Sequence, residues 1–176
     1  MREIDLSIKL ENGMAVYPGD PAVEITEIHT LDIKGWCLRK LTLSTHIGTH
    51  VNVPYHMIQD GKNLDAYTLD LFFGPAVIYE DGINFDKEIG VIFRNQNIDQ
   101  RLGHLLITNP PKFVGLSSTF EFDIDIEKLL LKHDIISFEN LSNTDQLPLQ
   151  FMFYGVPLNI SGSDGSPVRA FAVIED

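Results

Sequence analysis

Alternating hydrophobic and polar residues recur along this chain in short runs that predict β-strands. The clearest run is 37–44, where Leu38, Lys40 and Thr42 alternate with Arg39 and Leu41. A period of two residues places successive side chains on opposite faces of a strand. Runs rich in β-branched and aromatic residues, bounded by turn residues, extend this prediction along the chain. Eight strands are predicted, at residues 4–10, 23–30, 37–44, 74–80, 103–108, 135–139, 151–158 and 168–174.

The segment 124–133 has the charge pattern of a helix. Asp125 and Glu127 lie near its start, and Lys132 and His133 lie at its end. Charges in this order interact favourably with the helix dipole and stabilise the helix. A second, shorter helix is predicted at 97–102. Many strands with few helices predict a mixed, strand-rich α/β domain built around a curved mixed sheet.

Length, charge and cysteine content limit the range of functions that this chain could have. The chain has 176 residues, which suits one domain spanning residues 1–176. It has no apolar run of about 18 residues, and its charged start is unlike a signal peptide, so we expect a cytoplasmic protein. A net charge of −12 disfavours nucleic acid and anionic membranes as partners. The single cysteine, Cys37, excludes an internal disulfide and is interpreted as a small buried residue.

Three of the six histidines, His46, His50 and His56, lie within eleven residues. Gly48 and Pro54 disfavour a helix there, so a strand that runs into a loop is favoured. In an extended segment, positions 46, 50, 52 and 56 share one parity, and their side chains would converge on one face. Imidazoles gathered in this way are typical of a catalytic metal site with a nearby general base. The alternative is three hydrogen-bonded loop histidines, because H-x3-H alone is a weak signal.

The histidine segment resembles the signature of the Putative cyclase family, which includes bacterial kynurenine formamidases. That signature reads H-x-G-T-H-x-D-x-P-x-H, and this chain has His46-Ile-Gly-Thr-His-Val-Asn-Val-Pro-Tyr-His56. Further stretches resemble the family in the expected order along nearly the whole chain. They are Val16-Tyr-Pro-Gly-Asp-Pro21, Asp60-Gly-Lys62, Gly74-Pro-Ala76, Glu139-Asn-Leu141 and Asp164-Gly-Ser-Pro-Val-Arg-Ala170.

The resemblance implies a metal-dependent hydrolase with a swivelling β/β/α-type domain, assembled as a homo-oligomer, either a dimer or a tetramer. Carried over by position, His46 and His50 would be metal ligands, and Glu139 would be the carboxylate ligand. His56 would be the catalytic acid/base. Tyr17 stands where an aromatic residue of the family lines the substrate pocket.

Two positions depart from the family pattern. The signature aspartate is Asn52 here, and the family's helix histidine aligns with Glu127. Asparagine can ligate through its carbonyl oxygen but bridges two metals poorly, whereas Glu127 offers an oxygen ligand. Asn52 and Glu127 therefore complete the predicted ligand set, with zinc as the expected metal and manganese as the alternative. The alternatives are a loop side chain for Asn52 and a dipole-favoured acid at a helix start for Glu127.

The sequence therefore favours a metal-dependent amidohydrolase of the arylformamidase type. It would cleave an amide, formamide-type or related C–N or ester bond of a small molecule by metal-activated water. The alternative is a degenerate, non-catalytic member that acts as a binding protein or structural oligomer. Two further residues are noted: Arg169 is interpreted as the partner of an acid such as Asp164, and Trp36 is assigned to core, pocket or interface without a choice among them.

Overall fold

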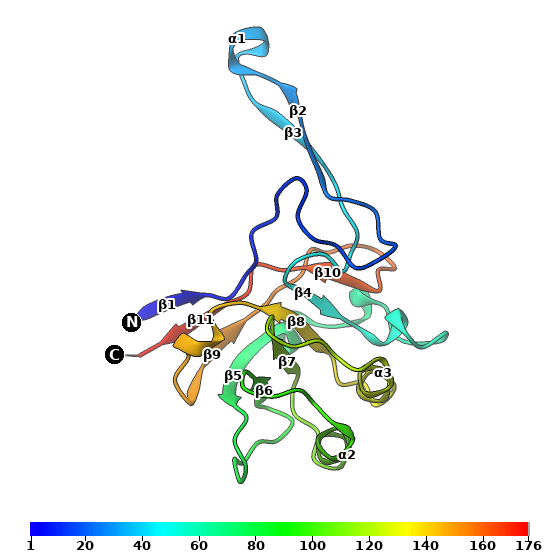
Figure 1. Ribbon diagram of the computed structural model, residues 1–176, viewed down its shortest axis with the longest axis vertical. Helices are drawn as coiled ribbons and strands as arrows, with labels where there is room; N and C mark the ends of the chain where they lie inside the picture. Colours follow the sequence, from blue (N-terminus) through cyan, green and yellow to red (C-terminus); the bar gives the residue numbers. More distant parts are fainter. Residues whose placement is uncertain (176) are drawn as a thin grey trace.

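The computed structural model describes residues 1–175 and contains one large mixed sheet with a protruding two-stranded arm (Figure 1). In the described residues the large sheet has nine strands in the order β1-β11-β9-β5-β6-β7-β8-β4-β10. These strands are β1 (Arg2–Asp5), β4 (His50–Asn52), β5 (Phe73–Ile78), β6 (Gly90–Phe93), β7 (Val114–Ser117), β8 (Ser137–Leu141), β9 (Gln150–Tyr154), β10 (Gly165–Pro167) and β11 (Phe171–Ile174). The mixed, strand-rich fold predicted from the sequence is confirmed.

Strands β5 to β8 run parallel to one another, and the remaining neighbours pair antiparallel. Parallel neighbours need a crossover connection. Helix α2 (Gln100–Thr108) connects β6 to β7, and α3 (Ile124–Lys132) connects β7 to β8. The two helices lie side by side beside these strands (Figure 1). None of the helices in residues 1–175 has the length and hydrophobicity that crossing a bilayer requires.

One predicted strand is wrong and one predicted helix is displaced. Residues 103–108 belong to α2, which starts after the cap residue Asp99 rather than at residue 97. The Asp99 carboxylate accepts a hydrogen bond from the backbone of Leu102, as expected of a helix N-cap. Leu102 and Leu106 are buried on one side of α2, so helical spacing describes this segment better than alternation.

Two hydrophobic clusters fill the two sides of the sheet. One contains Val51 and Phe138 together with residues of β5, β9 and β11. The other lies under α2 and α3 and includes Leu102, Ile126 and Leu130. Side chains alternate between the two faces along a strand. Because Val51 faces the core, its neighbours His50 and Asn52 on β4 point to the opposite face. In the same way Phe138 faces the core and Glu139, its neighbour on β8, faces away from it.

The second sheet consists only of β2 (Glu24–His29) and β3 (Leu38–Thr42), joined through the short helix α1 (Leu31–Lys34). Both strands were predicted, at 23–30 and 37–44, and are confirmed. This hairpin projects away from the large sheet as an arm, with α1 at its tip (Figure 1). We call residues 24–42 the arm.

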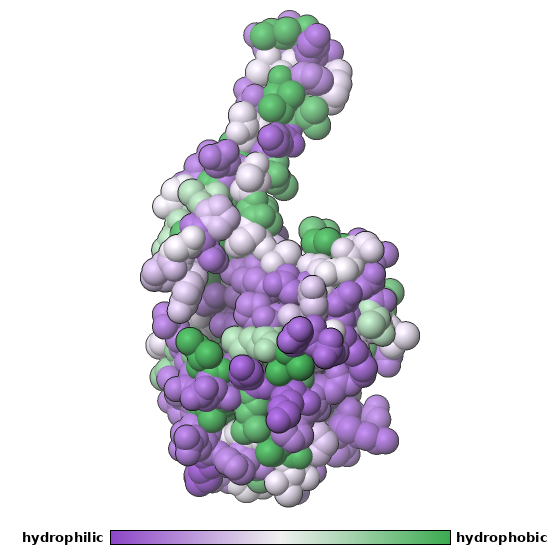
Figure 2. Space-filling model, turned by 90° about the vertical axis from the view of Figure 1, so that its right-hand side faces the viewer, coloured by the Kyte–Doolittle hydropathy of each residue, from purple (hydrophilic) through white to green (hydrophobic). Residues whose placement is uncertain are grey.

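The arm exposes hydrophobic side chains, among them Trp36, which is 50% exposed. Figure 2 shows hydrophobic patches at the tip of the arm and along its length. Cys37 also lies in the arm and is exposed, so the sequence-based interpretation of Cys37 as buried is wrong.

Candidate active site

The histidine segment forms a turn, a short strand and a turn of 3-10 helix. His46 lies in the turn before β4, His50 and Asn52 lie on β4, and His56 ends the 3-10 helix Pro54–His56. The extended conformation predicted for the whole run is therefore found only at 50–52. Gly48 has a φ of +59°, and a β-carbon there would lie 2.8 Å from Leu10. This turn, rather than parity, directs His46 toward the other residues.

Strand pairing brings distant residues beside β4. His50 pairs with Glu139 of β8, and Asn52 pairs with Ser137. On its other side, β4 pairs with β10, whose first residue Gly165 faces Asn52. Residues directly opposite each other on antiparallel strands have their side chains on the same face. The register therefore places His50, Asn52 and Glu139 together.

A buried polar group, which we call the inner cluster, forms on this face. It consists of His50, Asn52, Glu127, Ser137 and Glu139. The Asn52 side-chain nitrogen donates a hydrogen bond to one oxygen of Glu127 and one oxygen of Glu139. The Ser137 hydroxyl donates to the same Glu127 oxygen at 3.0 Å. Glu127, which comes from α3, is only 5% exposed, so it is a buried partner of Asn52 rather than a solvated acid at a helix start.

The two carboxyl groups of the inner cluster have opposite pKa shifts. Burial, together with the nearby charge of Glu139, raises the pKa of Glu127 to about 8. Burial also opposes ionisation of Glu139, but hydrogen bonding and the charge of His50 outweigh it and lower the Glu139 pKa. Two adjacent buried carboxyl groups do not both ionise easily without a compensating positive charge. The inner cluster therefore carries less than its full negative charge unless a cation lies beside it.

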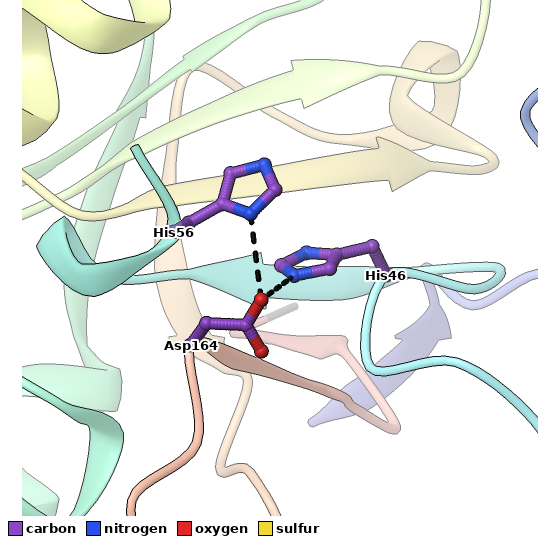
Figure 3. A group of neighbouring side chains, drawn as sticks. All are labelled: His46, His56 and Asp164. Atoms are coloured by element: carbon purple, nitrogen blue, oxygen red, sulfur yellow. Dashed lines mark hydrogen bonds and ion pairs between the residues drawn. The ribbon is translucent and has the colours of Figure 1, made fainter. Parts of the chain in front are cut away.

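A second group, the outer cluster, consists of His46, His56 and Asp164 (Figure 3). One carboxylate oxygen of Asp164 lies 2.7 Å from His46 Nε2 and 3.6 Å from His56 Nδ1. The other oxygen accepts a hydrogen bond from the Thr45 hydroxyl at 2.9 Å. The two imidazole rings lie 3.9 Å apart, centroid to centroid. Burial and the charge of the His46 ring lower the pKa of His56.

His46 links the two clusters. Its Nδ1 lies 2.7 Å from the Asn52 side-chain oxygen, while its Nε2 faces Asp164. A β-carbon at Gly165 would lie 2.8 Å from the His46 ring, so a glycine at this position leaves room for the ring against β10. Asn52 thus bonds to His46 and to both glutamates. This pattern contradicts its interpretation as a loop side chain that bonds its own backbone.

The inner cluster has the donor chemistry of a divalent-metal site. His50 Nδ1 lies 2.9 Å from the carbonyl oxygen of Gly48, which can only accept, so Nδ1 carries the hydrogen. The protonated ring pairs with a Glu139 oxygen, which lies 3.7 Å from Nε2. In the neutral ring, which is the form that binds a metal, Nε2 instead carries a lone pair directed at the same oxygen. Two electron-pair donors that face each other suit a cation placed between them. With the adjacent Glu127 carboxyl these donors are of the types that bind divalent metals. The Asn52 amide would first have to turn, because its nitrogen faces the two glutamates and its oxygen faces His46.

The structure brings together His46, His50, Asn52, Glu127, Glu139 and His56, but not every predicted site residue. Within residues 1–175, Tyr17 makes no hydrogen bond or ring contact with either cluster, and its side chain is 69% exposed in a turn. The predicted pairing of Arg169 with Asp164 is wrong. Arg169 makes two hydrogen bonds to Asp5, at 2.9 and 2.6 Å.

Sequence reasoning missed Asp164 as a member of the site. The Asp-Gly-Ser-Pro motif noted above was the available signal, but an aspartate before a glycine is also a common turn residue. Only the pairing of β10 with β4 shows that this motif lies beside the histidines.

The chain is similar to a known enzyme over almost its whole length. It is 30% identical to kynurenine formamidase from Salinibacter ruber, across 97% of this chain and 96% of that protein. The family described as Putative cyclase matches residues 4–88, which include the complete histidine segment. The chain belongs to the Putative cyclase family. Its relatives in that family include kynurenine formamidases, which are hydrolases, and the chain is therefore assigned to the hydrolases.

Solved structures share the fold of this Putative cyclase family member. Isatin hydrolase A from Labrenzia aggregata, bound to benzyl benzoate, superposes with a TM-score of 0.85 over 99% of this chain and 94% of that chain, at 21% identity. A protein described as a potential metal-dependent hydrolase with cyclase activity superposes with a TM-score of 0.78 over 97% and 96%, at 17% identity. The nine-stranded sheet with its two crossover helices is therefore an arrangement that solved structures also contain.

Proposed function

We propose that this protein is a metal-dependent hydrolase that cleaves an amide, of the formamide type, or a related C–N or ester bond of a small molecule. The observation that carries the proposal is the buried face on which His50, Asn52, Glu127 and Glu139 meet beside His56. Similarity to kynurenine formamidase supports an amide as the substrate class.

His46, His50, Asn52, Glu127 and Glu139 are the residues that would hold the metal, with zinc expected and manganese as the alternative. A divalent ion supplies Lewis-acid chemistry when bound there, because it polarises a carbonyl and lowers the pKa of water. The first contribution of the chain is to orient its donors. The Gly48 carbonyl fixes the His50 ring so that Nε2 faces Glu139, and Ser137 fixes the carboxyl of Glu127.

His56 is the proposed acid/base. Its Nδ1 faces Asp164, which leaves Nε2 to take a proton from the attacking water and return it to the leaving nitrogen. Burial lowers the pKa of His56, so the neutral ring, which is the form that accepts a proton, is present near neutral pH. Asp164 is a positioning residue because it contacts His46 and His56 through the same oxygen.

Replacing Asp164 by asparagine is expected to lower kcat roughly 10- to 100-fold, with little change in KM, at saturating zinc. The amide keeps the shape of the side chain but loses the charge that orients both imidazoles. Steady-state kinetics on an aryl formamide measure both constants. Asp145→Asn, on an exposed turn, is the matched control. A variant whose KM rises while kcat stays unchanged would show that Asp164 only binds substrate.

Metal content tests the proposed function directly. Protein purified without chelator or metal-affinity resin is expected to contain close to stoichiometric zinc or manganese by elemental analysis. The double variant His50→Ala, Glu139→Gln should lose that metal, because it removes the two donors that face each other. If the native protein stays metal-free after soaking in zinc and in manganese, it is a non-catalytic binding or structural member. The Asn52 bonds to both glutamates are the observation that favours this alternative.

We also infer a cytoplasmic homo-oligomer, a dimer or tetramer, that binds a small molecule rather than nucleic acid or membrane. The net charge of −12 supports the exclusion of phosphate-rich partners. Tyr17 is proposed to line the substrate pocket, on the basis of its position in the Val16-Tyr-Pro-Gly-Asp-Pro21 loop. Its exposure leaves its ring free to contact a ligand.

A further inference from the structure

A β-bulge lies beside the candidate metal site, in β8. Between Phe138 and Leu141, β8 advances by three residues while its neighbour β7 advances by two, from Gly115 to Ser117. Asn140 lies within this bulge and has a φ of +57°, in the left-handed region that few residues other than glycine adopt. A bulge changes the direction in which a side chain points, and bulges are common next to active sites. The contacts of Asn140 show what holds it in this conformation.

Two hydrogen bonds connect the bulge to the turn before β4. The pairing of β4 with β8 ends with His50 opposite Glu139. Beyond that pair, the Thr49 hydroxyl donates to the backbone carbonyl of Asn140 at 2.7 Å. The Asn140 side-chain nitrogen donates to the backbone carbonyl of Gly48 at 3.1 Å. These two bonds, which we call the Thr49–Asn140 bridge, hold the two segments together where the backbone ladder ends.

The bridge acts on the orientation of the His50 ring. The Gly48 carbonyl that Asn140 binds is the same carbonyl that lies 2.9 Å from His50 Nδ1. A carbonyl oxygen has two lone pairs, so it accepts from both donors at once. Asn140 therefore holds the acceptor that orients His50, and its own backbone directly follows Glu139. A single residue thus supports both of the donors that face each other across 3.7 Å.

We propose that Asn140 is a positioning residue of the metal site, which raises metal affinity by holding His50 Nε2 opposite Glu139. This role rests on the proposed function, because it concerns the same two donors. Asn140 does not itself face the metal position, since its side-chain nitrogen points to Gly48. Residues that orient metal ligands in this way commonly change metal affinity by about 10- to 100-fold when they are replaced.

Zinc affinity tests the role of Asn140 without any substrate. In metal-depleted protein, Asn140→Gly is expected to bind zinc roughly 10-fold more weakly than the native protein, as measured by competition with a chromogenic chelator. Glycine adopts a positive φ without strain, so the variant loses the side-chain amide but keeps the backbone of the bulge. The visible absorption spectrum of the cobalt-loaded variant should also differ from that of the native protein, because the donors around the ion are no longer held in the same geometry.

Asn143→Gly is the matched control. Asn143 also has a left-handed backbone, with a φ of +53°, and its side chain also donates to a backbone carbonyl, that of Asp5, at 2.8 Å. Each glycine variant therefore removes one side-chain hydrogen bond at a position that suits glycine. Both should lose a similar amount of stability in urea, whereas only Asn140→Gly should lose zinc affinity.

Two substitutions at Thr49 test the other bond of the bridge. Thr49→Ser keeps the hydroxyl that donates to Asn140, whereas Thr49→Val keeps the shape of the side chain and removes the hydroxyl. The valine variant is expected to bind zinc more weakly than the serine variant. Equal zinc affinity of the two folded variants would contradict the proposal.

The results distinguish failure of this role from failure of the proposed function. If the native protein binds zinc and Asn140→Gly binds it as tightly, Asn140 does not position the donors, although the metal site itself stands. The role is also wrong if Asn143→Gly loses as much zinc affinity as Asn140→Gly, because the loss then follows stability alone. If the native protein binds neither zinc nor manganese, the proposed function fails, and the role of Asn140 fails with it.

Discussion

Replacing His56 by alanine is expected to reduce turnover of an aryl formamide by about 10²- to 10⁴-fold, while the metal content stays that of the parent. The expectation follows from the place of His56 in the outer cluster. Its Nδ1 lies 3.6 Å from Asp164, and its ring lies against the His46 ring at an interplanar angle of 36°. Removing the ring removes the group that moves the proton, but none of the donors of the inner cluster. Single-turnover kinetics and elemental analysis on the same preparation measure both quantities.

A matched control is available on α2. His104 is an exposed histidine whose Nδ1 bonds the backbone carbonyl of Gln100, and His104→Ala should hydrolyse substrate at the native rate. The assignment of His56 is wrong if His56→Ala is as active as the parent. It is also wrong if that variant loses its metal. Loss of the metal would instead make His56 a metal ligand, together with His46 and Asp164. The donor atoms of these three residues all lie within 4.8 Å of one another.

The fold class could be predicted from local patterns in the sequence. The short buried strands could not be predicted in this way. Strands β2 and β3 alternate or have β-branched residues, and both were predicted. Strand β6 (Gly90–Phe93) and β7 (Val114–Ser117) are only four residues long and buried on both faces, so their sequences show no alternation. Residues 103–108 were predicted as a strand but form part of α2. A short apolar run such as His-Leu-Leu-Ile-Thr is compatible with a strand or a helix, and only its burial pattern distinguishes the two.

The site was partly predictable because its first residues are close in sequence. His46, His50 and His56 belong to one motif, and the family resemblance supplied Glu139 and Glu127. Asp164 is different, because it reaches the histidines only through the pairing of β10 with β4. Long-range pairing leaves no local trace in the sequence. The role of Asn52 was equally hidden, since its contacts come from α3, β8 and the turn before β4.

Replacing Asn52 by aspartate is expected to have opposite effects on the metal-free and the metal-loaded protein. Without metal, the change removes the nitrogen that donates to Glu127 and Glu139 and adds a third carboxyl to a fully buried position. An uncompensated buried charge costs about 3 kcal/mol or more, so the free energy of unfolding should fall by that amount. With metal, a charged ligand replaces a neutral one, and zinc affinity should rise roughly 10- to 100-fold.

Chemical unfolding with and without zinc measures the first effect, and competition with a chelator measures the second. Asn109→Asp is the control, because Asn109 also donates a side-chain hydrogen bond, to the carbonyl of Phe85, but lies outside both clusters. The double variant Asn52→Asp, Glu127→Gln should recover most of the metal-free stability, since it removes one of the three carboxyl groups. If Asn52→Asp binds zinc no more tightly than the parent, residue 52 is not a ligand. The amide of Asn52 then has a structural role, in which it takes the place of a cation between the two glutamates.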